Sequence, residues 1–195
     1  MAITLTPKLK KEYEDLFATC INKPGKQLSI EKLVGRIVAN RTRYEAVETL
    51  TGVPWYVVAA IHSLEGSLSF KTHLHNGDPL TAKTIHVPKN RPAAGSPPFT
   101  WEESATDALT FDNLTSVKSW NLAMILFRLE GFNGFGYRTK HPDVLTPYLW
   151  SFSNHYTKGK FVADGKFDPD FVSGQCGAAV IFKQMILAKV IAIPI

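Results

Sequence analysis

The chain has 195 residues, of which 45% are hydrophobic and 20% are charged, and this balance excludes an intrinsically disordered protein. The formal net charge of +5 favours anionic partners such as a bacterial cell wall, although the same charge also serves solubility. The densest basic cluster, at residues 8–11, is followed directly by acidic residues at 12–15. The sequence therefore does not predict a nucleic-acid-binding groove.

The organisation of the chain predicts one domain over residues 1–195, because we find neither an internal repeat nor a linker. No secretion signal is visible at the N-terminus, so the export route and the localisation stay open. The sequence does not give the oligomeric state either. Two lysines and a glutamine interrupt the apolar stretch 178–195, which predicts a core helix and no stable membrane insertion. Cys20 and Cys176 lack metal-ligand spacing and are expected to be buried thiols, with a disulfide between them as the alternative.

Apolar residues recur at helical spacing along most of the chain. Helix caps set the bounds: Thr6 precedes a proline, Ser29 is a typical cap, and Thr100 with Glu103 forms a capping box. The sequence predicts helices over residues 7–20, 30–38, 54–66, 101–111, 116–130 and 174–191.

Between the third and fourth helices the pattern changes to that of a β-hairpin. Residues 69–75 and 81–87 have the composition of strands, and Asn76-Gly77 is a strong signal for a tight turn. Asp164-Gly165 marks a second tight turn, which Asp168 is expected to serve. We therefore expect a mainly α fold with a small β-hairpin.

Glu65 is the most informative ionisable residue, because it ends a helix that is apolar nearly all round, just where the predicted hairpin begins. Burial in apolar surroundings would raise the pKa of such a carboxyl group. A protonated carboxyl group is what a glycosidase needs to protonate a glycosidic oxygen. The alternative is a glutamate that only ends its helix.

Four stretches, in this order, resemble the lysozyme superfamily, in particular phage endolysins and bacterial muramidases. They read VPWYVVAAIHSLEGSLSFKTHLHNGDPL, PPFTWEESATDAL, LEGFNGFGYR and LWSFSNHYTKGKFVADGKFDP. The resemblance implies a lysozyme-like fold, in which a hairpin lobe flanks a cleft. It also implies hydrolysis of the β-1,4 bond between N-acetylmuramic acid and N-acetylglucosamine in a peptidoglycan glycan strand, with Glu65 as the acid and no cofactor. Goose-type lysozymes and lytic transglycosylases often have serine after this glutamate, where this chain has Gly66.

A second carboxylate would decide the type of reaction. Some phage lysozymes carry an aspartate in the hairpin and a threonine six positions later, and Asp78 and Thr84 match that interval. An aspartate there would hold a water molecule for direct displacement. The interval from Glu65 is longer than usual, and the alternative is that Asp78 only serves the turn.

Three histidines in the hairpin region, His73, His75 and His86, raise the question of a metal site, to which Asp78 would add a ligand. No further histidine or cysteine has suitable spacing, so we predict no metal. Contacts with sugar, or exposure to solvent, are the expected roles of these histidines.

Aromatic and glycine-rich loops in the second half of the chain are candidates for binding the glycan. Tyrosine rings stack on sugar rings, and asparagine side chains hydrogen-bond acetamido groups. The resemblance places an asparagine-glycine segment and a late tyrosine in the cleft, so Asn133, Gly134, Tyr137 and Tyr156 are the predicted substrate-binding residues. Ordinary core packing is the alternative for each.

Two other functions stay open. A lytic transglycosylase would use Glu65 first as acid and then as base, while a hydroxyl of the muramyl sugar closes an anhydro ring; a chitinase-like glycosidase is a close variant. A catalytically silent wall-binding protein would have the same fold without the activity.

Overall fold

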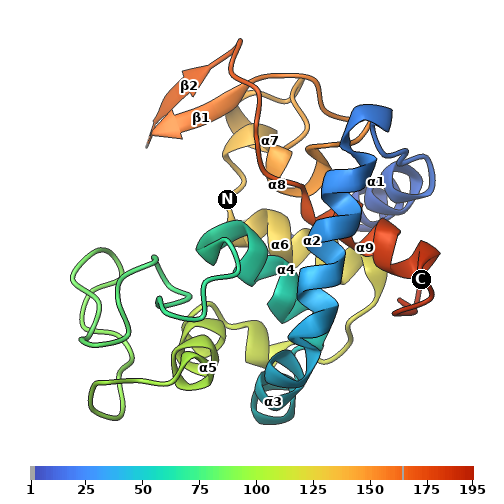
Figure 1. Ribbon diagram of the computed structural model, residues 1–195. Helices are drawn as coiled ribbons and strands as arrows, with labels where there is room; N and C mark the ends of the chain where they lie inside the picture. Colours follow the sequence, from blue (N-terminus) through green and yellow to red (C-terminus); the bar gives the residue numbers. More distant parts are fainter. Residues whose placement is uncertain (1–2, 164) are drawn as a thin grey trace. The chain divides into compact units, whose positions relative to one another are not determined.

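The computed structural model describes residues 3–163 and 165–195. These residues form nine α-helices, two short 3-10 helices and one two-stranded antiparallel sheet (Figure 1). The predicted mainly α fold with a small hairpin is confirmed at that level. No helix in the described part of the chain is both long enough and apolar enough to cross a bilayer.

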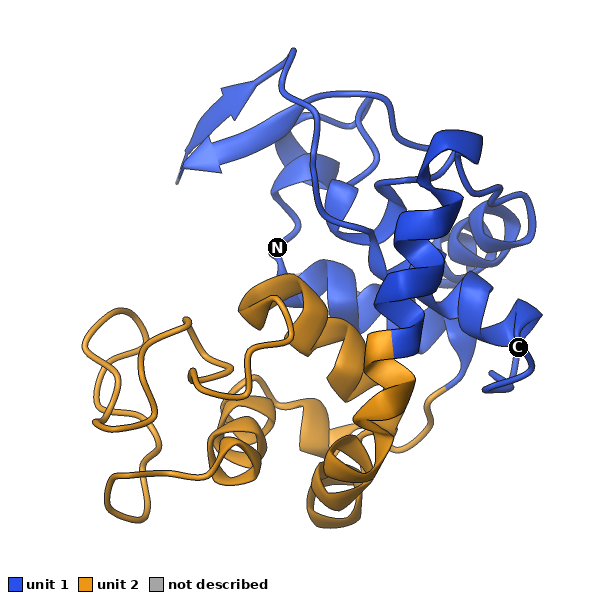
Figure 2. Ribbon diagram, in the orientation of Figure 1, with its two compact units in different colours: residues 1–35, 121–195 blue, residues 36–120 orange. Residues whose placement is uncertain are grey.

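The chain divides into two compact units, which Figure 2 shows in different colours. Unit 1 consists of two separate stretches, one up to Gly35 and one from Asn121 onward. Unit 2 is the single stretch Arg36–Trp120. The helix α2 (Gln27–Ala39) begins in unit 1 and ends in unit 2.

Unit 1 is built on the contact between α1 (Pro7–Ala18) and α6 (Leu122–Phe132). Helix α1 begins as predicted, because Oγ1 of Thr6 accepts the N–H of Leu9. The short helices α7 (Gly136–Lys140) and α8 (Pro147–Trp150) follow α6, and α8 and α6 both contact α9 (Ala178–Leu187). Both cysteines lie in this unit as buried free thiols, as the sequence predicts.

The β-hairpin lies in unit 1, not in the region where the sequence predicts it. Strands β1 (Lys160–Ala163) and β2 (Lys166–Asp168) pair antiparallel. Asp164 of the predicted Asp164-Gly165 turn lies outside the described residues. Asp168 serves the following turn, since its Oδ1 accepts the N–H groups of two later residues.

Unit 2 contains a helix that the sequence analysis did not predict, α3 (Arg41–Thr51). It packs against α4 (Trp55–Gly66) and against α5 (Trp101–Phe111). Helix α4 is buried nearly all round, and the capping box at the start of α5 is present, both as predicted.

The segments 69–75 and 81–87, predicted as paired strands, are not strands. The tight turn between them is present, because the N–H of Gly77 donates to the carbonyl of His73 at 2.9 Å. Beyond it, only an isolated bridge joins Thr72 to Pro79. The backbone N–H groups of Ile85 and His86 donate to the side chain of Asp78 instead of to a neighbouring strand, so this segment forms no ladder.

Three predicted helix starts also differ from the structure. Ser29 is not a cap, because α2 begins at Gln27, directly after the 3-10 helix η1 (Pro24–Lys26). The helix predicted from residue 116 begins only at Leu122, after the 3-10 helix η2 (Leu114–Ser116). The last helix begins at Ala178, four residues later than predicted.

Candidate functional site

Glu65 lies next to the last residue of α4 in unit 2, as the sequence predicts. Its side chain is exposed, so the expected dry environment is wrong for this structure. The reason is geometric: Leu64 and Leu68 on either side take the buried positions, with 7% and 8% exposure. Glu65 is therefore an exposed residue at the end of a buried helix.

The backbone that follows Glu65 is strained. Ser67 and Leu68 both have left-handed conformations, with φ of 49° and 59°. Residues other than glycine rarely adopt this region, and each such residue costs about 1–3 kcal/mol. The N–H groups of both residues donate to the carbonyl of His62, which closes the turn. Two strained residues in succession therefore fix the direction in which α4 ends.

A buried histidine holds this turn from the inside. His62 is 0% exposed, with Nε2 at 3.0 Å from the carbonyl oxygen of Ser69 and Nδ1 at 3.0 Å from Oη of Tyr44. A carbonyl oxygen can only accept, so Nε2 carries the proton and Nδ1 accepts the tyrosine hydroxyl. Burial lowers the pKa of His62 to about 4, so the ring is neutral near pH 7.

Aromatic rings from α5 and from the chain after α4 enclose this histidine. The ring centroids of Trp101 and Phe70 lie 4.5 Å and 4.6 Å from that of His62. The guanidinium of Arg43 lies 4.0 Å from the Phe70 ring centre and forms two hydrogen bonds with Glu102. Residues of α3, α4 and α5 thus combine to fix the segment that carries Glu65.

Gly66 stands where goose-type lysozymes and lytic transglycosylases often have serine, and the position of His62 favours glycine here. A Cβ atom on Gly66 would lie 2.9 Å from Cδ2 of His62, closer than real Cβ contacts. The imidazole is held on both nitrogens, so it cannot move aside without losing a hydrogen bond. A glycine therefore fits this position best.

The carboxylate of Asp78 organises the loop that follows. Its side chain is 8% exposed, and Oδ2 accepts the N–H groups of Ile85 at 2.8 Å and His86 at 3.0 Å. Oδ1 lies 2.6 Å from Nδ1 of His86. These hydrogen bonds, first of all that from the His86 backbone N–H, lower the pKa of Asp78 to about 2. The contacts support the role of a turn residue, while the water-holding role stays a prediction.

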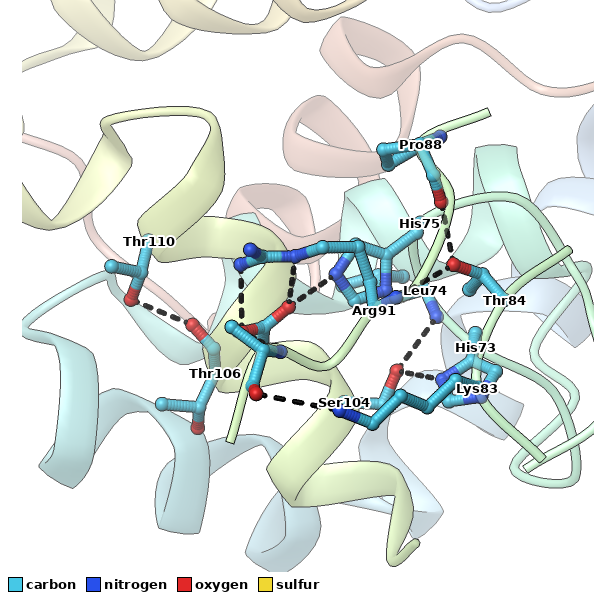
Figure 3. A network of polar contacts seen from close by, with 12 residues as sticks. His73, Leu74, His75, Lys83, Thr84, Pro88, Arg91, Ser104, Thr106 and Thr110 are labelled. Atoms are coloured by element: carbon cyan, nitrogen blue, oxygen red, sulfur yellow. Dashed lines mark hydrogen bonds and ion pairs between the residues drawn. The ribbon is translucent and has the colours of Figure 1, made fainter. Parts of the chain in front are cut away.

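The hydroxyl group of Thr84 both donates and accepts a hydrogen bond within the same loop. Oγ1 donates to the carbonyl of Pro88 and accepts the N–H of Arg91 at 2.9 Å (Figure 3). The residue is only 1% exposed. Its contacts, like those of Asp78, serve the loop.

The loop histidines are fixed by α5. His73 contacts Oγ of Ser104 at 2.8 Å, and His75 contacts the carboxylate of Asp107 at 2.8 Å. Arg91, which Figure 3 labels, forms two further hydrogen bonds with Asp107. Among the described residues no group of three or more side chains could hold a metal ion. Sequence reasoning missed Ser104 and Asp107, although their spacing of three places both on one face of α5.

The predicted substrate-binding residues lie in unit 1 and divide into two kinds. Asn133 and Gly134 are exposed at the end of α6. Tyr137 and Tyr156 are 4% and 2% exposed, so neither ring offers a face to a sugar. Oη of Tyr137 accepts the N–H of Phe161, and that of Tyr156 contacts backbone groups within 3.1 Å. The structure therefore places both tyrosine rings in the core, although Tyr137 also lines a pocket of unit 1.

Comparison of the chain with protein-family models, with curated proteins and with solved structures found no match. The candidate site therefore depends on its own geometry and on the resemblance seen in the sequence. In that geometry the exposed Glu65 lies at the end of a buried helix, beside a strained turn. The hydrogen bonds of the neutral His62 hold this turn in place.

The buried His62 predicts a specific dependence of stability on pH. Its pKa is about 4 in the folded protein and about 6.5 when unfolded, so the unfolded chain binds a proton first as the pH falls. The contribution of the neutral His62 to the free energy of unfolding is fully present above pH 6.5. It falls by up to about 3 kcal/mol as the pH is lowered towards 4. Denaturant unfolding across this range measures it. His62→Gln should be less stable near neutral pH and vary less with pH, and an unchanged pH dependence would contradict the assignment.

Gly66→Ala should lower the thermal midpoint by several degrees, because the added methyl group collides with His62. Gly35→Ala is the matched control, since nothing lies within 4 Å of a Cβ at that helical position. That substitution should leave stability unchanged or raise it by about 0.5–1 kcal/mol. Equal effects of the two substitutions on thermal unfolding would show that Gly66 has no steric role.

Proposed function

We propose that the protein is a peptidoglycan-cleaving glycosidase of the muramidase type, with Glu65 as the general acid. The observation that carries the proposal is the placement of Glu65 on a rigid but strained helix end. Strained backbone is concentrated at functional sites, and here the buried contacts of His62 maintain it. The four stretches that resemble lysozyme-superfamily enzymes support the same residue.

The proposed chemistry needs Glu65 to deliver a proton to the oxygen of the β-1,4 bond. Its exposure in the free protein makes the carboxyl group accessible to a long polymer. A bound sugar ring would displace water from the carboxyl group and disfavour its charged form. The acid would therefore be protonated when the glycan covers it, without burial in the free enzyme.

The nucleophile distinguishes the two candidate reactions. An inverting hydrolase needs a base that holds a water molecule. Asp78 is the predicted base, but its carboxylate already accepts three hydrogen bonds from the loop. That observation favours keeping the lytic transglycosylase as the second candidate, because its nucleophile is a hydroxyl group of the substrate itself.

Glu65→Gln tests the acid directly. The amide keeps the shape but donates no acidic proton, so we expect the lysis of a cell-wall suspension to slow by at least about a hundredfold. Because the side chain is exposed, thermal unfolding should hardly change. Glu31→Gln makes the same change at another exposed site and should stay active. A wild-type protein without lytic activity would overturn both the muramidase and the transglycosylase, and would leave the chitinase-like and wall-binding alternatives.

The ends of the products identify the reaction. Hydrolysis should yield reducing muramic ends from purified peptidoglycan, as mass spectrometry can show. Anhydromuramic ends would replace the hydrolase by the transglycosylase. Asp78→Asn adds a second test: lost activity at an unchanged thermal midpoint assigns Asp78 to the water molecule. A lowered midpoint with activity retained in the folded protein assigns it to the loop.

A further inference from the structure

Unit 1 contains a pocket that the proposed reaction does not use. Its volume is about 400 Å³, within the range of small-ligand pockets. Every lining residue belongs to unit 1, whereas Glu65 belongs to unit 2. Charged groups gather at one part of the lining, and Pro142, Val144 and Leu145 make another part apolar.

The charged part is built around a buried carboxylate. Glu130 is 3% exposed and accepts two hydrogen bonds from Arg138, at 3.1 Å and 2.8 Å, and one from Oη of Tyr13 at 2.5 Å. Nη1 of Arg138 also donates to Glu12 at 2.8 Å. Two carboxylates thus surround one guanidinium, which leaves a net charge of −1. Buried ion pairs seldom add stability over apolar packing, so this cluster suggests a role beyond folding.

The cluster has donors and an acceptor left for a ligand. A guanidinium has five N–H groups, and the contacts with Glu130 and Glu12 use three of those on Arg138. Thr146 accepts the N–H of Tyr148, so its hydroxyl can still donate. Glu12 is the most accessible member, with 36% exposure, and its hydrogen bond with Arg138 uses one of its two oxygens. The pocket therefore presents two kinds of donor beside an uncompensated carboxylate.

We propose that this pocket binds an amino-acid group that carries both a free ammonium and a free carboxylate. Glu12 would bind the ammonium, Arg138 and Thr146 the carboxylate, and the apolar part of the lining the aliphatic chain. The inference builds on the proposed function: in peptidoglycan it identifies the free end of a diamino acid in the stem peptide. The protein would then recognise the peptide with unit 1 while unit 2 carries the acid for the glycan.

Calorimetric titration with a free peptide tests the pocket without any glycosidic bond. The probe is the tripeptide L-alanyl-γ-D-glutamyl-meso-diaminopimelate, and we expect a dissociation constant below about 1 mM. The same peptide with L-lysine in the third position lacks the distal carboxylate. It should bind at least about tenfold more weakly, the usual effect of losing one charged hydrogen bond. Equal affinity for the two peptides, or no binding of the first, overturns the proposal.

Glu12→Gln locates the site. It removes the charge that meets the ammonium and keeps a polar side chain of the same size at a partly exposed position. Affinity should fall by about tenfold or more. Glu31→Gln, in the same unit, should bind like the wild-type protein. An unchanged affinity of Glu12→Gln rejects this pocket as the site.

The two proposals fail separately. Cleavage of peptidoglycan without binding of the tripeptide overturns the pocket assignment alone. Binding that Glu12→Gln weakens, in a protein that does not cleave peptidoglycan, supports the pocket and overturns the proposed glycosidase.

Discussion

The neutral imidazole of His62 is the contact on which the structure around Glu65 depends. It joins a hydroxyl group on α3 to a carbonyl just beyond α4, and its own carbonyl closes the strained turn. A charged imidazole could not accept from Tyr44, so the brace requires the low pKa that burial provides. The imidazole also needs space and an apolar enclosure. Gly66 leaves that space because it has no side chain, and the rings of Trp101 and Phe70 pack around the imidazole.

Local signals in the sequence predicted helices where a cap or an apolar pattern was strong. The capping box of Thr100 and Glu103 and the apolar helix that ends at Gly66 are examples. Helix α3 was missed because its buried residues are few and polar residues separate them. The hairpin was misplaced for a different reason: alternation in residues 81–87 reflects side chains such as Thr84, which point inward to bind loop backbone. Periodicity alone does not distinguish that arrangement from a ladder.

The sequence predicts the position of Glu65 at a helix end, but it does not predict how exposed the residues of the candidate site are. The end of an apolar helix located Glu65, yet exposure depends on which neighbouring leucines turn inward, and that is a tertiary property. The burial of Tyr156 likewise depends on backbone groups of residues 159 and 173, which the sequence does not place beside it. The residues Glu12, Glu130 and Arg138 come from distant parts of the chain, so no local sequence motif predicts their cluster.

The division of unit 1 into two stretches has a consequence for the order in which the chain folds on the ribosome. Tyr13 and Glu130, whose contact links α1 to α6, are separated by 117 positions. Unit 2 is continuous, so its own contacts can form while α1 still lacks its partner. Until α6 has been synthesised, the apolar face of α1, with Leu9 and Phe17, lacks its main contact. The buried residues of α1 therefore stay without the helix that they pack against until α6 has been made, so unit 1 can complete its core only after unit 2.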